Sequence, residues 1–137
     1  MKAFFDSSAL AKRYIDEPGS EGIESICLKA EIIGVSILCM PEIISALCRL
    51  KRESVITNTQ YNIAKQALFK DLEDAMVCNI TPSVIRQSIK ILEENPLRAM
   101  DALHIGCALE WKAEVFISSD LKQISSAENA GLKVIKV

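Results

Sequence analysis

Residues 3–19 read AFFDSSALAKRYIDEPG, and this stretch joins a short apolar run to a single acid and then to a helical pattern. The apolar run, Ala3–Phe5, is typical of a buried strand. Asp6 follows at once, and Ser7–Asp16 predicts a helix that the next Pro-Gly pair ends. A strand that leads directly into a helix predicts the repeating unit of a parallel sheet.

The same alternation continues to the end of the chain. Apolar, β-branched runs predict four more strands, and amphipathic segments between them predict helices. This pattern favours an α/β sandwich around a central, mainly parallel sheet of four or five strands, in a single domain spanning 1–137. The further strands are expected at 32–37, 76–80, 115–117 and 132–135, and the further helices at 20–30, 41–50, 57–72, 82–94, 99–112 and 121–129.

Composition narrows the classes of function. Half of the 137 residues are hydrophobic, and the net charge is −2, so no long-range basic field attracts nucleic acid. The five cysteines form no C-x-x-C pair, and a single histidine accompanies them, which speaks against structural zinc. Free thiols indicate a reducing compartment, hence the cytoplasm. We expect no signal peptide and no membrane span, because the apolar runs are short and soon interrupted.

Four of the 18 acidic residues lie in sequence contexts that are not typical of solvent-exposed positions. Asp6 and Asp120 each follow a predicted strand directly, so they meet in one cleft if those strands are neighbours in a parallel sheet. Glu42, after Pro41, lies in the first turn of a predicted helix, and Asp101 lies in the apolar string AMDALHIGCAL. Clustered carboxylates repel one another, and a hard divalent cation such as Mg²⁺ or Mn²⁺ compensates that repulsion.

Each acid also has a simpler interpretation. Asp6, Glu42 and Asp120 suit helix N-terminal turns, where the dipole favours negative charge. A carboxylate in an apolar helix is costly unless it is paired or metal-bound, and His104, three residues after Asp101, offers a pair. His104 is itself a candidate general base, but its apolar neighbours favour a packed, hydrogen-bonded histidine.

Four motifs spread over the chain resemble those of the PIN-domain nucleases, and specifically the VapC-type toxins of toxin–antitoxin pairs. They are FFDSSALAKRYIDEPGSE, PEIISAL, RAMDALHIGCAL and FISSDLKQ with GLKVIKV after it. The resemblance implies a three-layer α/β/α sandwich. It also implies a metal-dependent endoribonuclease that leaves a 5′-phosphate and a 3′-hydroxyl.

The resemblance assigns Asp6, Glu42, Asp101 and Asp120 as catalytic metal ligands for one or two Mg²⁺ or Mn²⁺ ions. Ser8 and Ser118 match supporting hydroxyl positions, although both also suit helix caps. Some relatives carry a further acid after the last one, where this chain has Leu-Lys-Gln, so a second ion is expected to depend on substrate. The implied partners are an RNA substrate, a small cognate antitoxin and a second copy of the chain.

Other features leave alternatives open. Arg13 is the best candidate for a phosphate contact, although a solvated helix face explains it equally simply. An aspartyl-phosphate phosphatase is a second possibility for Asp6, but such enzymes use D-x-D and this chain has Ser8 at the second position. A catalytically inactive, PIN-like interaction or scaffold protein is a third.

Overall fold

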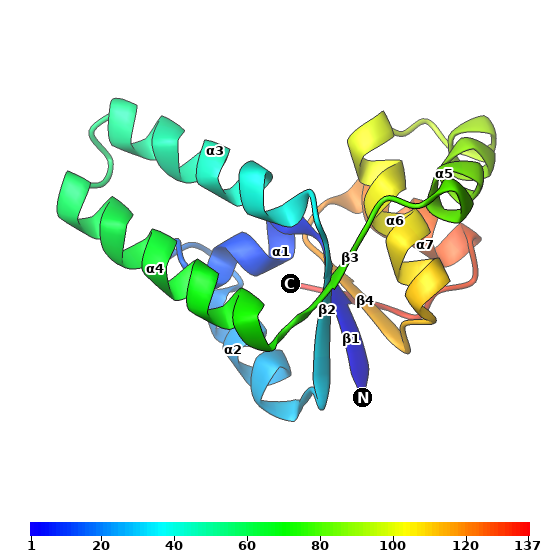
Figure 1. The fold of residues 1–137 in the computed structure, drawn as a ribbon, viewed down its shortest axis with the longest axis horizontal. Coiled ribbons are helices and arrows are strands. Elements are labelled where there is room, and N and C mark those ends of the chain that lie inside the picture. The colour runs from blue at the N-terminus through cyan, green and yellow to red at the C-terminus, as the bar shows by residue number, and fades with distance from the viewer.

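The computed structural model describes all residues, from 1 to 137, and contains one five-stranded sheet flanked by helices (Figure 1). All strand pairs are parallel, and the strand order is β3-β2-β1-β4-β5. The predicted parallel α/β sandwich is therefore confirmed. The strands are β1 (Lys2–Phe5), β2 (Ile32–Ser36), β3 (Met76–Cys78), β4 (Val115–Ser118) and β5 (Val134–Lys136).

Helices cover both faces of the sheet and produce three layers. One layer contains α1 to α4, and the other contains α5 to α7 (Figure 1). Thr57 caps α4 through a reciprocal capping box with Gln60. The helices are α1 (Ser7–Leu10), α2 (Ser20–Lys29), α3 (Cys39–Arg52), α4 (Asn58–Asp74), α5 (Pro82–Glu94), α6 (Ala99–Trp111) and α7 (Leu121–Asn129), with a 3₁₀ turn η1 (Ala11–Arg13).

Two separate hydrophobic cores hold the layers to the sheet. Side chains alternate along each strand, so Phe5 of β1 enters the core with α1 to α4, whereas Phe4 enters the core with α5 to α7. Phe116 of β4 stacks on Phe4 with 5.9 Å between ring centroids. Both faces of β1 and β4 are thus buried, which explains the continuous apolar sequences of these two strands.

The register of β1 and β4 decides where the functional residues lie. The two strands are hydrogen-bonded neighbours, with Phe5 opposite Ile117. The backbone N–H of Asp6 donates to the Ile117 carbonyl at 3.1 Å, which continues the ladder one residue further. Asp6 and Asp120 therefore leave adjacent strands at the same edge of the sheet, as the parallel pattern predicts.

Most helix and strand bounds lie within two residues of the sequence prediction, and the first helix departs furthest. The helix expected over Ser7–Asp16 ends at Leu10 and continues only as the 3₁₀ turn η1. Helix α3 begins at Cys39, two residues before Pro41, and the proline fits because the N–H groups of a first turn have no helical partner. No helix of the structure is both long and apolar enough to cross a membrane.

Candidate metal-dependent active site

Asp6 is the most deeply buried of the four predicted acids, with 1% of its surface exposed. It caps α1 through a hydrogen bond from the Ala9 N–H to Oδ1 at 2.9 Å. Ser8 Oγ also donates to Oδ1, at 2.8 Å, and Ser118 Oγ donates to Oδ2 at 2.5 Å. Burial raises the pKa of Asp6, and these hydrogen bonds offset the rise only in part.

Ser118 connects two of the predicted acids. While its hydroxyl donates to Asp6, the same oxygen accepts the backbone N–H of Asp120 at 3.0 Å. Asp120 then caps α7, because its Oδ1 accepts the N–H groups of Lys122 and Gln123 at 2.9 and 3.1 Å. Asp120 therefore both follows strand β4 and caps helix α7, so the two interpretations of this residue are compatible.

Glu42 reaches toward the same edge of the sheet from the first turn of α3. Its Oε1 accepts a hydrogen bond from Ser7 Oγ at 2.8 Å and lies 2.5 Å from His104 Nε2. Burial alone raises the pKa of Glu42, but His104 and Ser7 outweigh it, so the pKa is lowered. Ser7 follows Asp6 in sequence, so Glu42 contacts the residue next to Asp6 at the start of α1.

Asp101 lies in the first turn of α6, and its partner differs from the one that the sequence suggests. His104 points to Glu42, and Asp101 Oδ2 instead accepts from Arg98 Nε at 3.2 Å. The Asp101 side chain is 13% exposed, whereas that of Arg98 is 82% exposed. Gln123 Nε2 donates to the Asp101 carbonyl at 3.0 Å and so ties α7 to the start of α6.

A shallow cavity of about 730 Å³ joins the second pair of acids. Asp101 and Asp120 line it together with Arg98 and Lys122. The four predicted acids thus form a row of neighbours, from Glu42 through Asp6 and Asp120 to Asp101, linked by the serine hydroxyls and by this cavity.

The donor chemistry of this row fits a hard divalent cation, since every ligand offered is a carboxylate or hydroxyl oxygen. The side chains as they lie are not gathered into a cage, because no three His, Cys, Asp or Glu side chains are close enough to hold one ion. Glu42 is held by His104 and Asp101 by Arg98. Each of these two acids thus already has a partner in the structure, through Oε1 of Glu42 and Oδ2 of Asp101.

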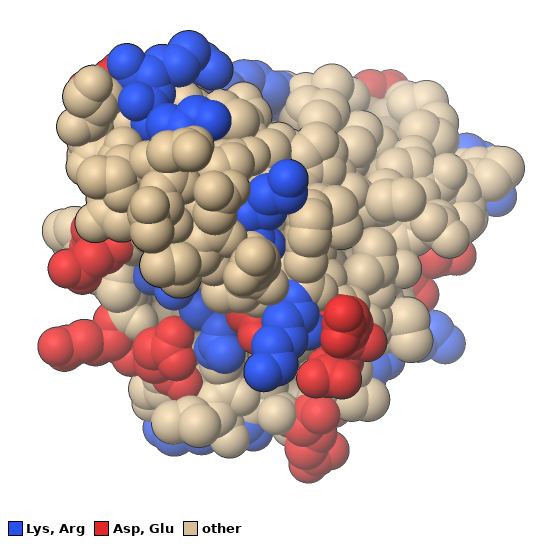
Figure 2. All heavy atoms as spheres, turned by 60° about the vertical axis from the view of Figure 1, so that its left-hand side comes forward, with Lys and Arg blue, Asp and Glu red and all other residues tan.

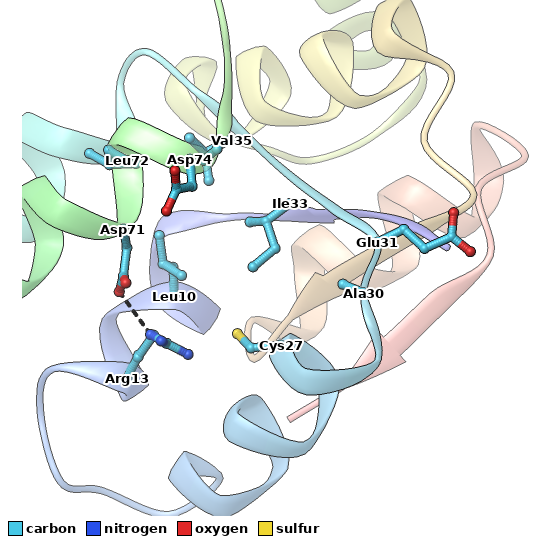
Figure 3. Close-up of a pocket in the computed structure, with 11 residues that line it drawn as sticks. Leu10, Arg13, Cys27, Ala30, Glu31, Ile33, Val35, Asp71, Leu72 and Asp74 are labelled. Carbon is cyan, nitrogen blue, oxygen red and sulfur yellow. Dashed lines mark hydrogen bonds and ion pairs between the residues drawn. The ribbon is translucent and has the colours of Figure 1, made fainter.

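Arg13 lines a cavity other than the one between Asp101 and Asp120 (Figure 3). Its Nε donates to Asp71 Oδ2 at 2.8 Å, and Tyr14 Oη donates to the same oxygen at 2.7 Å. A cavity of about 240 Å³ beside Arg13 is lined by Cys27 and Leu72 among others, and none of the four acids lines it. The phosphate contact expected of Arg13 stays a prediction. In the structure the Arg13 guanidinium forms an ion pair with Asp71.

Three residues that contact the predicted acids were not singled out from the sequence: Ser7, Arg98 and Gln123. Ser7 and Arg98 had available signals, because Ser7 adjoins Asp6 and Arg98 precedes Asp101 by three residues, a spacing that places side chains on one helix face. No sequence signal indicated Gln123, because its contact is with Asp101, 22 residues away in another helix.

Comparisons with known proteins agree on the fold. The sequence model of the PIN domain family matches residues 3–130. Among solved structures, the chain is similar to the sarcin-ricin-loop-cleaving toxin VapC20 of Mycobacterium tuberculosis, with TM-score 0.72, 14% identity, and 98% of this chain and 99% of that one covered. A comparison with curated proteins found no match.

Two further solved structures are similar to the chain. VapBC2 of Rickettsia felis, bound to a DNA fragment from its promoter, gives TM-score 0.70 and 14% identity over 100% of this chain and 99% of that chain. FitAcB of Neisseria gonorrhoeae gives TM-score 0.72 and 12% identity over 98% and 96%. Identities this low show that the fold is shared and nothing finer.

Proposed function

Because the chain belongs to the PIN domain family, we propose that it is a metal-dependent endoribonuclease and the toxin of a VapC-type toxin–antitoxin pair. PIN domains are generally nucleases. The reaction proposed is hydrolysis of an RNA phosphodiester bond to a 5′-phosphate and a 3′-hydroxyl. The alternative of an aspartyl-phosphate phosphatase has no support in the family match.

The observation that carries this proposal is the buried Asp6 carboxylate at the carboxyl end of β1. Three hydrogen bonds hold it, yet no Lys, Arg or His side chain forms an ion pair with it. A buried carboxylate without a countercharge is costly unless a cation compensates it. Its neighbours in the acid row are the residues that complete a set of oxygen ligands.

Asp6, Glu42, Asp101 and Asp120 would hold Mg²⁺ or Mn²⁺, with one ion expected and a second dependent on substrate. When bound, such an ion acts as a Lewis acid on the phosphodiester and favours ionisation of the attacking water. The protein's contribution is positioning. Ser8 and Ser118 fix the orientation of the Asp6 carboxylate, and Ser7 aims Glu42.

The distribution of surface charge favours RNA binding through a few local contacts and not through a broad basic surface. The net charge is −2, and on the face drawn in Figure 2 basic side chains form a small group at the upper left and are otherwise interspersed with acids. No broad basic surface on that face attracts nucleic acid over long distances. RNA binding is therefore expected to depend on the site itself and on its bound cation.

The partners proposed are a small antitoxin and a second copy of the chain. One similar structure is described as a toxin–antitoxin complex and another as a member of a family of toxin–antitoxin systems, which supports the antitoxin. Large apolar side chains such as Leu28 and Leu121, 86% and 66% exposed, leave surface for either partner. All five cysteines are free, which agrees with a reducing compartment such as the cytoplasm.

The test is to express the protein alone in a bacterial host and to sequence RNA ends after a brief induction. We expect discrete new 5′-phosphate ends, and we expect Asp6→Asn to abolish them. Asp16→Asn, which removes an exposed acid outside the site, is the matched control and should cleave normally. Equal cleavage by wild type and Asp6→Asn would contradict the proposed mechanism.

One observation favours the alternative of an inactive, PIN-like interaction protein. The acids are not gathered for an ion in the structure, and an arginine already neutralises one of them. Calorimetric titration of the purified protein with Mn²⁺ separates the two proposals. Binding that Asp6→Asn removes supports the nuclease, whereas an absence of heat at millimolar Mn²⁺ supports the scaffold.

A further inference from the structure

Arg98 lines the same cavity as Asp101 and Asp120. Its side chain is 82% exposed, and its one ion pair is the 3.2 Å contact from Nε to Asp101. Lys122, which lines the same cavity, forms no ion pair. Two cationic side chains therefore flank two of the proposed metal ligands.

Local helix physics does not explain this arrangement. Arg98 occupies the N-cap position of α6 and makes no capping hydrogen bond, and Lys122 lies in the first turn of α7. Positive charge is disfavoured at helix N-termini, which attract anions instead. Residues that break a local rule without a structural gain are typical of functional sites.

The Arg98–Asp101 pair is also a weak structural element. An arginine this exposed is solvated by water and screened by salt, so the pair contributes little to folding. Breaking it therefore costs little. The planar guanidinium that it frees matches a phosphate group as well as it matches a carboxylate.

We propose that Arg98 is an RNA-phosphate-binding residue of this site, and that Asp101 holds it until Asp101 takes up a cation. This inference rests on the proposed function, because it assumes RNA as substrate and Asp101 as metal ligand. Arg98 then exchanges one anionic partner for another. Substrate phosphate enters the cavity that Arg98 and Asp120 line, at the N-terminal end of α6, which has no side-chain cap and whose backbone N–H groups also favour an anion.

The exchange can be tested without cleavage by measuring RNA binding in EDTA. Asp101→Asn removes the partner of Arg98 and stands in for the state in which a cation occupies Asp101. The probe is a short, fluorescein-labelled, single-stranded RNA of mixed sequence, and the readout is fluorescence anisotropy over a series of salt concentrations. The variants are Asp101→Asn and Arg98→Ala, alone and combined, with Arg86→Ala as control. Arg86 is an exposed arginine of α5 outside the cavity.

We expect Asp101→Asn to tighten RNA binding and Arg98→Ala to cancel that gain. In the Asp101→Asn background, Arg98→Ala should reduce the slope of log Kd against log salt by about 0.7, the value for one phosphate contact on a single strand. Arg98→Lys should retain most of the slope, because it keeps the charge. Arg86→Ala should leave the slope unchanged in both backgrounds.

The inference is overturned if the gain from Asp101→Asn persists in full without Arg98, since the gain then comes only from removing a negative charge. It is also overturned if Arg98→Ala and Arg86→Ala behave alike, or if the Asp101→Asn protein binds no RNA. Thermal melts show whether each variant is folded. A protein that shows Arg98-dependent binding but never cleaves RNA would refute the nuclease proposal and leave this inference standing.

Discussion

Replacing Ser118 with alanine tests how the site holds its buried carboxylate. Ser118 is fully buried, so water does not readily replace its hydroxyl. The change removes the hydrogen bond to Asp6, and a bond to a charged group is worth roughly 1.5–3 kcal/mol. It also leaves the Asp120 N–H without its acceptor, at a further cost of about 0.5–1.5 kcal/mol. We expect Ser118→Ala to lower the free energy of unfolding by roughly 2–4 kcal/mol.

The assay is urea denaturation in EDTA, arranged as a double-mutant cycle with Asp6→Asn. Asparagine keeps the shape and the Oδ1 acceptor but removes the charge, so Ser118→Ala should cost about 1–2 kcal/mol less in that background. Ser88→Ala is the matched control, because the buried Ser88 hydroxyl donates only to backbone carbonyls, and its cost should not depend on Asp6. An equal cost of Ser118→Ala in both backgrounds would refute the reasoning that the hydroxyl supports a charged Asp6.

Three further predictions follow from the same structure. Mn²⁺ at about 100 times its Kd should stabilise the wild type by about 2.7 kcal/mol in thermal melts. Asp101→Asn should lose much of that stabilisation, whereas the control Asp16→Asn should keep it. An undiminished stabilisation of Asp101→Asn would show that Asp101 is not a metal ligand. Burial raises the pKa of Asp6, so the folded state binds this proton more tightly than the unfolded state, and metal-free stability should fall as pH rises above the ordinary value of 3.8. The difference in unfolding free energy between Asp6→Asn and wild type should therefore grow from about pH 4 to about pH 8, and a constant difference would contradict the raised pKa. Gly34→Ala should cost about 1–3 kcal/mol in urea denaturation, because the new Cβ would lie 2.5 Å from the Trp111 ring, and a neutral result would mean that the ring moves freely.

Local sequence pattern was sufficient for most of the fold. Apolar runs such as Val115–Ser118 and breakers such as the Pro-Gly pair at 18–19 are local signals, and the structure follows them. The early end of α1 has a cause that lies elsewhere in the chain. Arg13 and Tyr14 both bind Asp71 of α4, and this contact fixes the segment after Leu10 in place of a continued helix. Periodicity within a segment carries no information about such a partner.

The site divides in the same way. The strand-end positions of Asp6 and Asp120 could be predicted, because parallel strands expose their carboxyl ends at one edge. The partners of Asp101 and Glu42 could not. The i, i+3 spacing of Asp101 and His104 indicates a possible contact, but His104 turns instead to Glu42, 62 residues away in sequence. Which of several sterically allowed partners a side chain takes is settled by tertiary packing.

The division of the interior into two cores has a consequence for how the protein fails. Asp6 and Glu42 are carried by the layer of α1 to α4, whereas Asp101 and Asp120 are carried by the layer of α6 and α7. The acid row therefore crosses the boundary between the two layers, and few side-chain contacts besides the sheet hold its halves together, among them those of His104 with Glu42 and of Ser118 with Asp6. Substitutions that loosen either core, far from any acid, would misalign the row before the molecule unfolds. Across a library of core variants, residual activity should track the weaker of the two halves rather than the stability of the whole.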